Sequence, residues 1–208
     1  MALKNKRVKN LMFVGTGSNV GKSVITAAMG RILKEDGYNP APFKSQNMAL
    51  NSFVTKDGLE IGRAQSVQAE ACGIEPLVEM NPILLKPSGD NLSQVVVLGK
   101  PLGNLRAKEY FCKKDMLWNI IESSFRKISE KYNPVVIEGA GSISELNLKK
   151  NDIVNIPVAK LADAATFLVA DIDKGGVIGS VYGNIALLPE DEKRLIKGII
   201  INKFRGDL

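Results

Sequence analysis

The chain has 208 residues, of which 45% are hydrophobic and 24% are charged, and this balance suits one α/β domain with a sizeable core. The net charge is +6, but the Lys and Arg residues are scattered and only 6% of residues are aromatic, so a nucleic-acid-binding surface is not favoured. The absence of histidine excludes a Ser-His-Asp triad and a His-ligated metal. No apolar run approaches the roughly 18 residues of a membrane helix, and no signal peptide is recognisable, so we expect a cytoplasmic protein that binds no membrane.

Apolar strands alternate with amphipathic helices along the chain. Strand patterns occur at 9–15, 39–46, 134–142, 165–176 and 197–207, where the last residues of each range turn polar. Helical spacing predicts helices over 21–37, 58–73, 112–133 and 176–188, and Gly37 is the expected stop of the first. Residues 81–104 carry Pro and Gly around a strand-like stretch, which indicates an irregular excursion with a hairpin.

This alternation predicts an α/β fold, a mostly parallel sheet with helices on both faces, within a single domain over residues 1–208. In such sheets, ligands bind at the carboxyl ends of the strands. The polar clusters of the sequence follow the predicted strands, at 15–23, 44–47, 138–142, 171–176 and 202–207. We therefore expect the functional site at that edge of the sheet.

The stretch FVGTGSNVGKSVIT, residues 13–26, has the order of a phosphate-binding loop: a strand, a Gly-rich turn, Lys-Ser and a helix. The usual pattern is G-x-x-x-x-G-K-[ST], and Thr16 stands where its first Gly is expected. Backbone N–H groups of the turn would cradle phosphates, Lys22 would reach the terminal phosphate oxygens, and the Ser23 hydroxyl would hold Mg²⁺. A Gly-rich turn that binds nothing is the competing interpretation. The predicted nucleotide-binding residues of the loop are Gly15, Thr16, Gly17, Ser18, Asn19, Val20, Gly21, Lys22 and Ser23.

A variant of this loop reads G-T-x-[ST]-x-x-G-K-[ST], and residues 15–23 satisfy it. The variant is typical of the dethiobiotin synthetase-like group of P-loop ATPases. Six further blocks occur in the order found in the cobyric acid synthase family, and the chain closely resembles the ATP-binding amidoligase part of that family over nearly all of its length. These blocks are APFKSQNMALNS (41–52), GLEIGRAQ (58–65), MNPILLKPSGD (80–90), VVIEGAGSISELNL (135–148), ADIDKGGV (170–177) and INKFRGD (201–207).

The resemblance implies an ATP- and Mg²⁺-dependent ligase of cobalamin biosynthesis. Members of the family amidate four peripheral carboxylates of the corrinoid cobyrinic acid a,c-diamide, each through an acyl phosphate that ammonia then displaces. The ammonia comes from glutamine, which a C-terminal glutaminase domain with a Cys nucleophile and a His hydrolyses. Because this chain has no histidine, we expect that domain to be absent from it. The resemblance also implies a homodimer.

The residues that we expect to act on phosphate lie after the second and third predicted strands. Glu138 ends the strand VVIE, where an acidic Mg²⁺ ligand is expected opposite the loop, and Gly139 and Gly141 would let the backbone approach phosphates. Ser142 would donate to an oxygen of the substrate. From the resemblance, Lys44 would stabilise negative charge on the phosphate and the carboxylate. In the alternative interpretation neither residue acts in catalysis: Glu138 is solvated at the strand end, and Lys44 is a surface cation.

Further candidates depend more on the resemblance than on spacing. Asp57, or Glu60 in its place, would complete the Mg²⁺ shell, although acids at the start of the predicted helix also offset its dipole. Asp171 and Asp173 alternate along a strand end and so would point to opposite sides; Asp173 is the catalytic candidate, with a helix N-cap as its alternative role. Asn202 ends a strand and would pair with adenine.

Substrate contacts are the least constrained of these predictions. Gln46 and Asn47 would read amides or carboxylates of the corrinoid, with a plain turn as the alternative. Arg63, Lys86 and Arg205 lie within the resembling blocks and would receive carboxylates, although exposed cations need no ligand.

Two other functions of the same superfamily compete with this hypothesis. Partition- or division-site ATPases usually carry an additional lysine early in the phosphate loop, but residues 15–20 contain none. A ligase for a smaller substrate, such as dethiobiotin synthetase, is disfavoured by the QNMALNS and NKFRGD blocks. A binding module without catalysis is a third alternative.

Overall fold

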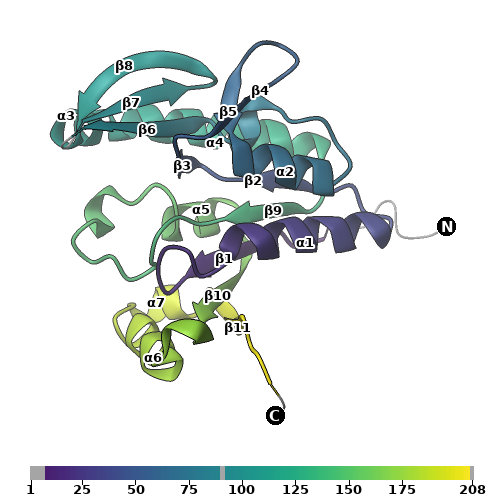
Figure 1. Cartoon of the computed structure of the whole chain (residues 1–208), viewed down its shortest axis with the longest axis vertical. Coiled ribbons are helices and arrows are strands. Elements are labelled where there is room, and N and C mark those ends of the chain that lie inside the picture. The colour runs from purple at the N-terminus through teal and green to yellow at the C-terminus, as the bar shows by residue number, and fades with distance from the viewer. Residues whose placement is uncertain (1–7, 90–91, 207–208) are drawn as a thin grey trace.

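The computed structural model describes residues 8–89 and 92–206, and a five-stranded parallel sheet forms the centre of this part of the chain. Figure 1 shows the strands side by side with the phosphate-loop candidate at the end of β1. This sheet confirms the predicted α/β class. In spatial order its strands are β11 (Ile196–Asn202), β10 (Ala165–Asp171), β1 (Leu11–Gly15), β9 (Val135–Glu138) and β2 (Ala41–Phe43).

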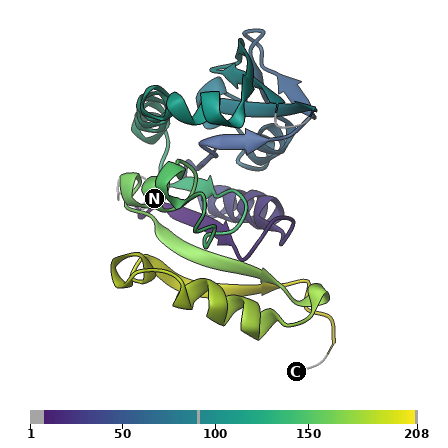
Figure 2. The ribbon, with the colours of Figure 1, turned by 90° about the vertical axis from the view of Figure 1, so that its left-hand side faces the viewer.

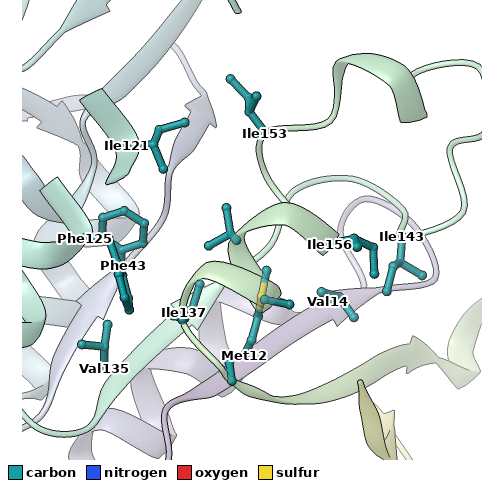
Figure 3. Close-up of a cluster of buried hydrophobic side chains, with 14 of the residues drawn as sticks. Met12, Val14, Phe43, Ile121, Phe125, Val135, Ile137, Ile143, Ile153 and Ile156 are labelled. Carbon is teal, nitrogen blue, oxygen red and sulfur yellow. The ribbon is translucent and has the colours of Figure 1, made fainter. Parts of the chain in front are cut away.

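Successive residues of a strand point to opposite sides of the sheet, and buried side chains lie on both sides of this one. On one face, Phe13 packs with Val20 and Leu33, which bring in the loop and helix α1 (Lys22–Glu35). On the other face, Met12 and Val14 belong to a larger cluster with side chains from α4 (Lys114–Lys131), α5 (Ile156–Leu161) and α6 (Val177–Ala186). Figure 3 shows part of this second cluster, in which Phe43 and Phe125 also meet edge to face. Helices therefore cover both faces, as predicted.

The helices agree with most of the predicted ranges. Gly37 follows α1 with a φ of 85°, so it ends that helix as expected. The range 58–73 is only partly helical, because Glu60–Gly62 forms strand β5, which pairs with β4 (Ser52–Val54). The α-helices are α1 (Lys22–Glu35), α2 (Arg63–Ala71), α3 (Ala107–Cys112), α4 (Lys114–Lys131), α5 (Ile156–Leu161), α6 (Val177–Ala186) and α7 (Glu190–Lys193). The 3₁₀ turns are η1 (Val78–Met80), η2 (Lys149–Asn151) and η3 (Ile172–Lys174).

A second sheet of four strands lies beyond β2, at the top of Figure 1. Strand β3 pairs with β6 in parallel, and β6, β7 and β8 form an antiparallel meander. The hairpin expected within 81–104 is therefore present, but it is part of a larger sheet that the sequence did not reveal. Its strands are β3 (Gln46–Met48), β6 (Ile83–Gly89), β7 (Leu92–Val97) and β8 (Lys100–Arg106).

Figure 2, turned by 90°, places α6 and β11 at the opposite end of the molecule from the four-stranded sheet, with β1 and α1 between them. In the described part of the chain, no helix has both the length and the apolar composition to cross a bilayer. Asp90 and Asp207, which belong to two of the blocks quoted above, lie outside the described residues.

Candidate functional site

The departure of Thr16 from the usual phosphate-loop pattern has a local explanation. Thr16 forms a β-bridge with Ser142, and its N–H donates to the Val169 carbonyl at 2.9 Å, an extended arrangement that a β-branched residue adopts readily. The need for glycine falls on Gly15 instead. A Cβ there would lie 2.7 Å from both the Gly17 carbonyl oxygen and the Lys22 Nζ, so the loop closes only over a glycine.

The second half of the loop turns through left-handed backbone before α1 begins. Asn19 has a φ of 60° and Gly21 a φ of 102°, and asparagine and glycine are the residues that tolerate this region best. The Asn202 side chain closes the turn from the end of β11, since its Nδ2 donates to the Val20 carbonyl at 2.9 Å. A Cβ on Gly21 would lie 2.0 Å from that nitrogen. Asn202 therefore contacts the phosphate loop itself, whereas the sequence analysis predicted a contact with adenine.

Lys22, the predicted phosphate-binding lysine, is buried within this loop. Its Nζ donates to the Gly17 carbonyl at 2.8 Å and to the Gly141 carbonyl at 2.9 Å, so it joins the loop to the segment after β9. Burial lowers the pKa of Lys22 to about 8; attraction by Glu138 opposes this shift, and repulsion by Lys44 adds to it. A partly dehydrated ammonium makes stronger hydrogen bonds when an anion replaces the neutral carbonyls that hold it.

Glu138 lies at the centre of a hydrogen-bonded cluster and is 2% exposed. Its Oε1 accepts from the Ser23 hydroxyl at 2.8 Å and from the Lys44 ammonium at 2.6 Å. On the other oxygen, the Gln68 amide donates at 2.6 Å and the Gln65 amide at 3.4 Å. The predicted trio of Ser23, Lys44 and Glu138 is thus brought together around one carboxylate.

Sequence reasoning missed the two glutamines. Gln65 and Gln68 are three residues apart on α2, so they lie on the same side of the helix, and both are at most 1% exposed. The sequence shows two glutamines at helical spacing but not that they are buried, and it is burial that makes these amides need partners in the protein.

Oxygen atoms for a magnesium ion are present where the sequence predicted them. The Ser23 hydroxyl and the Glu138 carboxylate are adjacent and are of the hard oxygen type that Mg²⁺ prefers, while water and phosphate oxygens usually supply its remaining ligands. Among the described residues, no cluster of three or more acidic, Cys or His side chains offers a complete protein cage. The residues present therefore fit a nucleotide-bound magnesium ion.

The acids proposed to complete that shell lie elsewhere, and their assignment to a helix start is wrong. Asp57 is exposed in the turn between β4 and β5, and Glu60 lies within β5. The Glu60 carboxylate accepts from the Lys86 ammonium. Burial raises the pKa of Glu60, but the hydrogen bonds from Lys86 and Ser52 and the charge of Lys86 together outweigh burial and hold this pKa below its usual value. The Gly-containing turn and the β4–β5 pairing replace the first helical turn that the pattern suggested.

The sequence suggested that Asp171 and Asp173 alternate along one strand, but the structure does not place both of them in β10. Asp171 is the last strand residue, whereas Asp173 lies in η3, where its N–H donates to the Asp171 carboxylate at 3.1 Å. Asp171 pairs with Lys203 at 2.7 Å, and Asp173 pairs with Arg205 at 3.0 Å. The N-cap of α6 is Gly176, so Asp173 does not cap that helix.

The loop after β9 is held by an asparagine that the sequence analysis did not single out. Asn155 accepts from the Ala140 N–H at 3.1 Å and donates to the Ala140 carbonyl at 2.8 Å. A Cβ on Gly139 would lie 2.2 Å from the Asn155 Oδ1, which explains a glycine at this position. The Ser142 hydroxyl donates to the Asn184 side chain on α6 at 2.8 Å.

A cavity of about 850 Å³ opens beside this loop. Strands β6 to β8 and helix α3 form one wall, residues 140–157 form another, and Ser18 brings the phosphate loop to its edge. Most of the lining is apolar. Gln46 also lines the cavity, and its side-chain oxygen accepts from the Tyr110 hydroxyl, another residue that the sequence analysis missed. Asn47 faces away from Tyr110, with its amide donating to Gln65 at 3.0 Å.

Comparison with known proteins identifies the nucleotide-binding fold. The family model for the CobQ/CobB/MinD/ParA nucleotide binding domain matches residues 11–208. The chain belongs to this family. The match covers the phosphate loop, the Glu138 cluster and the wall of the cavity, so this domain family accounts for the parallel sheet and its phosphate loop.

Relatives of this nucleotide-binding domain carry the name cobyric acid synthase. The protein of that name from Parabacteroides distasonis is 60% identical over 97% of this chain and 41% of its own length. Those from Phocaeicola vulgatus and Carboxydothermus hydrogenoformans are 58% and 55% identical over 98% and 95% of the chain, respectively. The chain spans about 40% of the length of these curated relatives.

The cations that the sequence suggested for substrate carboxylates are not in the cavity wall of this nucleotide-binding domain. Arg63 lies over the Phe53 ring at 5.7 Å, Lys86 pairs with Glu60, and Arg205 pairs with Asp173. Lys149 and Lys160 line the cavity instead. They pair with Glu192 at 2.8 Å and with Asp191 at 2.9 Å, respectively.

Proposed function

We propose that this chain is the ATP-dependent amide-forming part of a cobyric acid synthase, acting on peripheral carboxylates of cobyrinic acid a,c-diamide. The observation that carries the proposal is the phosphate loop at the edge of a large, mostly apolar cavity, which Ser18 of the loop and Gly141, a partner of Lys22, both line. A phosphoryl group held in the loop would therefore face a substrate in the cavity. The names of the relatives support the corrinoid as that substrate.

The reaction has two steps whose atoms balance. A carboxylate oxygen of the corrinoid attacks the γ-phosphorus of ATP, ADP leaves, and an acyl phosphate forms. Ammonia then attacks the acyl carbon, inorganic phosphate leaves with the C–O electron pair, and a proton is lost as the amide forms. Phosphoryl transfer depends mainly on positioning and on cations near the developing charge, so no histidine base is needed.

The chain supplies those cations from two sides. Lys22 would bind the terminal phosphate oxygens from within the loop, and Lys44 would stabilise charge on the carboxylate and the phosphoryl group that it attacks. Ser23 and Glu138 would hold Mg²⁺, which when bound neutralises phosphate charge. Of the two remaining acids, Asp173 stays a catalytic candidate, and Asp57, from the exposed β4–β5 turn, stays a candidate for the metal shell.

Adenine recognition is assigned to Asn202. Because one Nδ2 hydrogen is used by the Val20 carbonyl, the amide is held in one orientation and its Oδ1 remains an acceptor. The exocyclic amino group of adenine would donate to that oxygen. Guanine carries a carbonyl oxygen at the same position, and two acceptors would repel each other.

The cavity suits a large ligand with an apolar body and a polar rim. Gln46 would contact a peripheral amide or carboxylate, with Lys149 and Lys160 as further polar groups of the wall. Ser142 and Asn47 remain candidates through rearrangement, since their present partners are Asn184 and Gln65. Ammonia would come from glutamine through a glutaminase part, for which the greater length of the relatives leaves room. A homodimer is proposed only on the basis of the family resemblance.

The test is ATP turnover by the purified chain with Mg²⁺ and an ammonium salt, with and without cobyrinic acid a,c-diamide. We expect ADP release that depends on the corrinoid and matches the amide formed, as measured by mass spectrometry. Lys22→Ala is the matched control and should release no ADP above background. Steady ATP hydrolysis that is indifferent to the corrinoid would overturn the ligase assignment while retaining the nucleotide site.

A further inference from the structure

Lys174 reaches the phosphate loop from outside it. It ends the short turn η3 after β10, and its Nζ donates to the Ser18 carbonyl at 3.1 Å, across 156 positions of sequence. Strands β1 and β10 are neighbours in the sheet, which is why the turn that follows one lies beside the loop that follows the other. Residues 15–20 contain no lysine, but a lysine from the adjacent strand end contacts this part of the loop.

The turn that carries Lys174 has a defined shape. The Asp171 carboxylate accepts the Asp173 N–H at its start, and Gly175 and Gly176 follow with φ values of 73° and 61°. Two consecutive residues in the left-handed region need glycine, and they lead directly into α6. The backbone therefore fixes the origin of the Lys174 side chain, while the side chain itself is exposed.

Lys174 has no acidic partner in the part of the chain that the structure describes. The two nearest acids in sequence are taken, Asp171 by Lys203 and Asp173 by Arg205. Around the loop, Lys44 is paired with Glu138, whereas Lys22 and Lys174 are held by backbone carbonyls. Three ammonium groups thus lie at or beside the loop, where Glu138 acts on Lys22 and Lys44, and Asp171, the acid that acts on Lys174, is already paired with Lys203.

This excess of positive charge favours an anion at the loop, and the position of Ser18 indicates which part of that anion Lys174 meets. Ser18 lies at the edge of the cavity, where the phosphoryl group to be transferred must face the substrate. A cation bound to the Ser18 carbonyl is therefore on the terminal-phosphate side of the loop. Exchanging a neutral carbonyl for a phosphate oxygen makes its hydrogen bond charge-assisted on both sides.

We propose that Lys174 is a second phosphate-binding cation, whose ammonium leaves the Ser18 carbonyl and binds the γ-phosphate of ATP opposite Lys22. The proposal rests on the proposed function, because the γ-phosphate side of the loop is inferred from the substrate cavity, but it does not depend on which substrate the cavity binds. It assigns to the turn after β10 a part in distinguishing ATP from ADP. The contact would also stabilise the charge on the γ-phosphoryl group during its transfer to the carboxylate.

Calorimetric titration of the whole chain with ADP and with a non-hydrolysable ATP analogue tests this assignment. For Lys174→Ala we expect the dissociation constant of the ATP analogue to rise about tenfold, as for the loss of one charge-assisted bond, and that of ADP by much less. Lys174→Arg keeps the charge and should retain most of the preference for the triphosphate.

Lys197→Ala is the matched control, because the Lys197 ammonium also donates to a backbone carbonyl, that of Arg194 at 2.7 Å, but on β11. It should leave both dissociation constants unchanged. Equal weakening of ATP analogue and ADP by Lys174→Ala would assign a purely structural role to the lysine and overturn the proposal, as would no change. A wild-type chain that binds neither nucleotide would overturn the phosphate loop itself, and this proposal with it.

Discussion

The ammonium of Lys44 lies 2.6 Å from the carboxylate of Glu138, with 10% and 2% of the two side chains exposed. The two residues come from neighbouring parallel strands, since Lys44 follows β2 and Glu138 ends β9. Such a buried pair balances its desolvation cost by mutual attraction and by the further bonds from Ser23 and Gln68. The pair is therefore a structural unit of the site as well as part of its proposed chemistry.

Removing one partner of this pair should destabilise the domain more than removing both. Glu138→Gln leaves the Lys44 ammonium buried beside a neutral amide, and we expect a loss of about 3 kcal/mol in the free energy of unfolding. Adding Lys44→Met should restore part of that loss, because no unpaired charge remains. Urea denaturation of the two single variants and the double variant measures the coupling. Losses that simply add would mean that the pair contributes no joint stability.

A second prediction concerns Gly139 in the loop after β9. Gly139→Ala would place a methyl group 2.2 Å from the Asn155 Oδ1, so Asn155 must give up its two bonds to Ala140. We expect a loss of about 1–3 kcal/mol in unfolding free energy together with a weaker ATP affinity. Gly179→Ala in α6 is the control: its Cβ meets no atom within 4 Å, so the change should be neutral or should stabilise by up to ~1 kcal/mol. Unchanged stability in Gly139→Ala would show that Asn155 is not a clamp.

The role assigned to Asn202 predicts a change in base preference. Asn202→Asp removes the donor to the Val20 carbonyl and places a negative charge near the loop, so binding of all nucleotides should weaken. In Asn202→Ala, where only the amide is lost, we expect ATP to weaken by about 10- to 100-fold and GTP by less, since a bidentate Asn–adenine contact contributes about 1–3 kcal/mol. Competition titrations with both nucleotides measure the ratio. A ratio equal to that of the wild type would remove Asn202 from the base site.

Local signals of the sequence predicted the part of the site that is local in the chain. The order of β1, loop and α1 places Lys22 and Ser23 at the helix start whatever the rest of the fold does. Glu138 was identified for a similar reason, because an acid directly after a buried apolar strand is costly without a ligand or a partner. Its two partners from α2 were missed, since burial of Gln65 and Gln68 depends on how α2 packs, which no local pattern encodes.

The second sheet and the cavity depend on contacts between distant segments. Strand β3 has three residues and pairs with β6 only after an intervening hairpin and helix, so neither its existence nor its register could be read from periodicity. The start of α2 was misplaced for a related reason: the pairing of β5 with β4 overrides helical spacing in residues 60–62. Tyr110 lies in the cavity wall only because α3 packs against the β6–β8 meander, so the sequence alone could not place it there.

The lowered pKa of Lys22 predicts a pH dependence of nucleotide binding. The ammonium form binds phosphate, and with a pKa of about 8 in the free chain it is fully populated near pH 7 and mostly lost at pH 9. The apparent dissociation constant of ATP should therefore rise about tenfold between these two pH values. Lys22→Arg, whose side chain stays charged throughout, should bind with little dependence on pH in this range. A flat wild-type profile would place the Lys22 pKa well above 9.

Tyr110 makes the most specific prediction about the substrate. Its buried hydroxyl donates to the Gln46 side-chain oxygen, and burial raises the pKa of the phenol far above the physiological range, so it remains a donor. Because this bond holds the Gln46 oxygen toward Tyr110, the N–H groups of the amide remain available to a ligand, which suits an acceptor such as a carboxylate or an amide oxygen.

Tyr110→Phe removes that constraint while keeping the ring. The Gln46 amide can then turn its oxygen toward the cavity, and we expect the KM for the corrinoid to rise about 5- to 10-fold, as for the loss of about one neutral hydrogen bond, with little change in kcat or in the KM for ATP. Phe111→Leu is the control for the packing of α3, since Phe111 contacts the Tyr110 ring and also lines the cavity but has no polar atom. If the two variants raised the corrinoid KM equally, the effect would belong to wall packing. A lowered kcat with an unchanged KM in Tyr110→Phe would place the pair in the chemical step instead of in substrate binding.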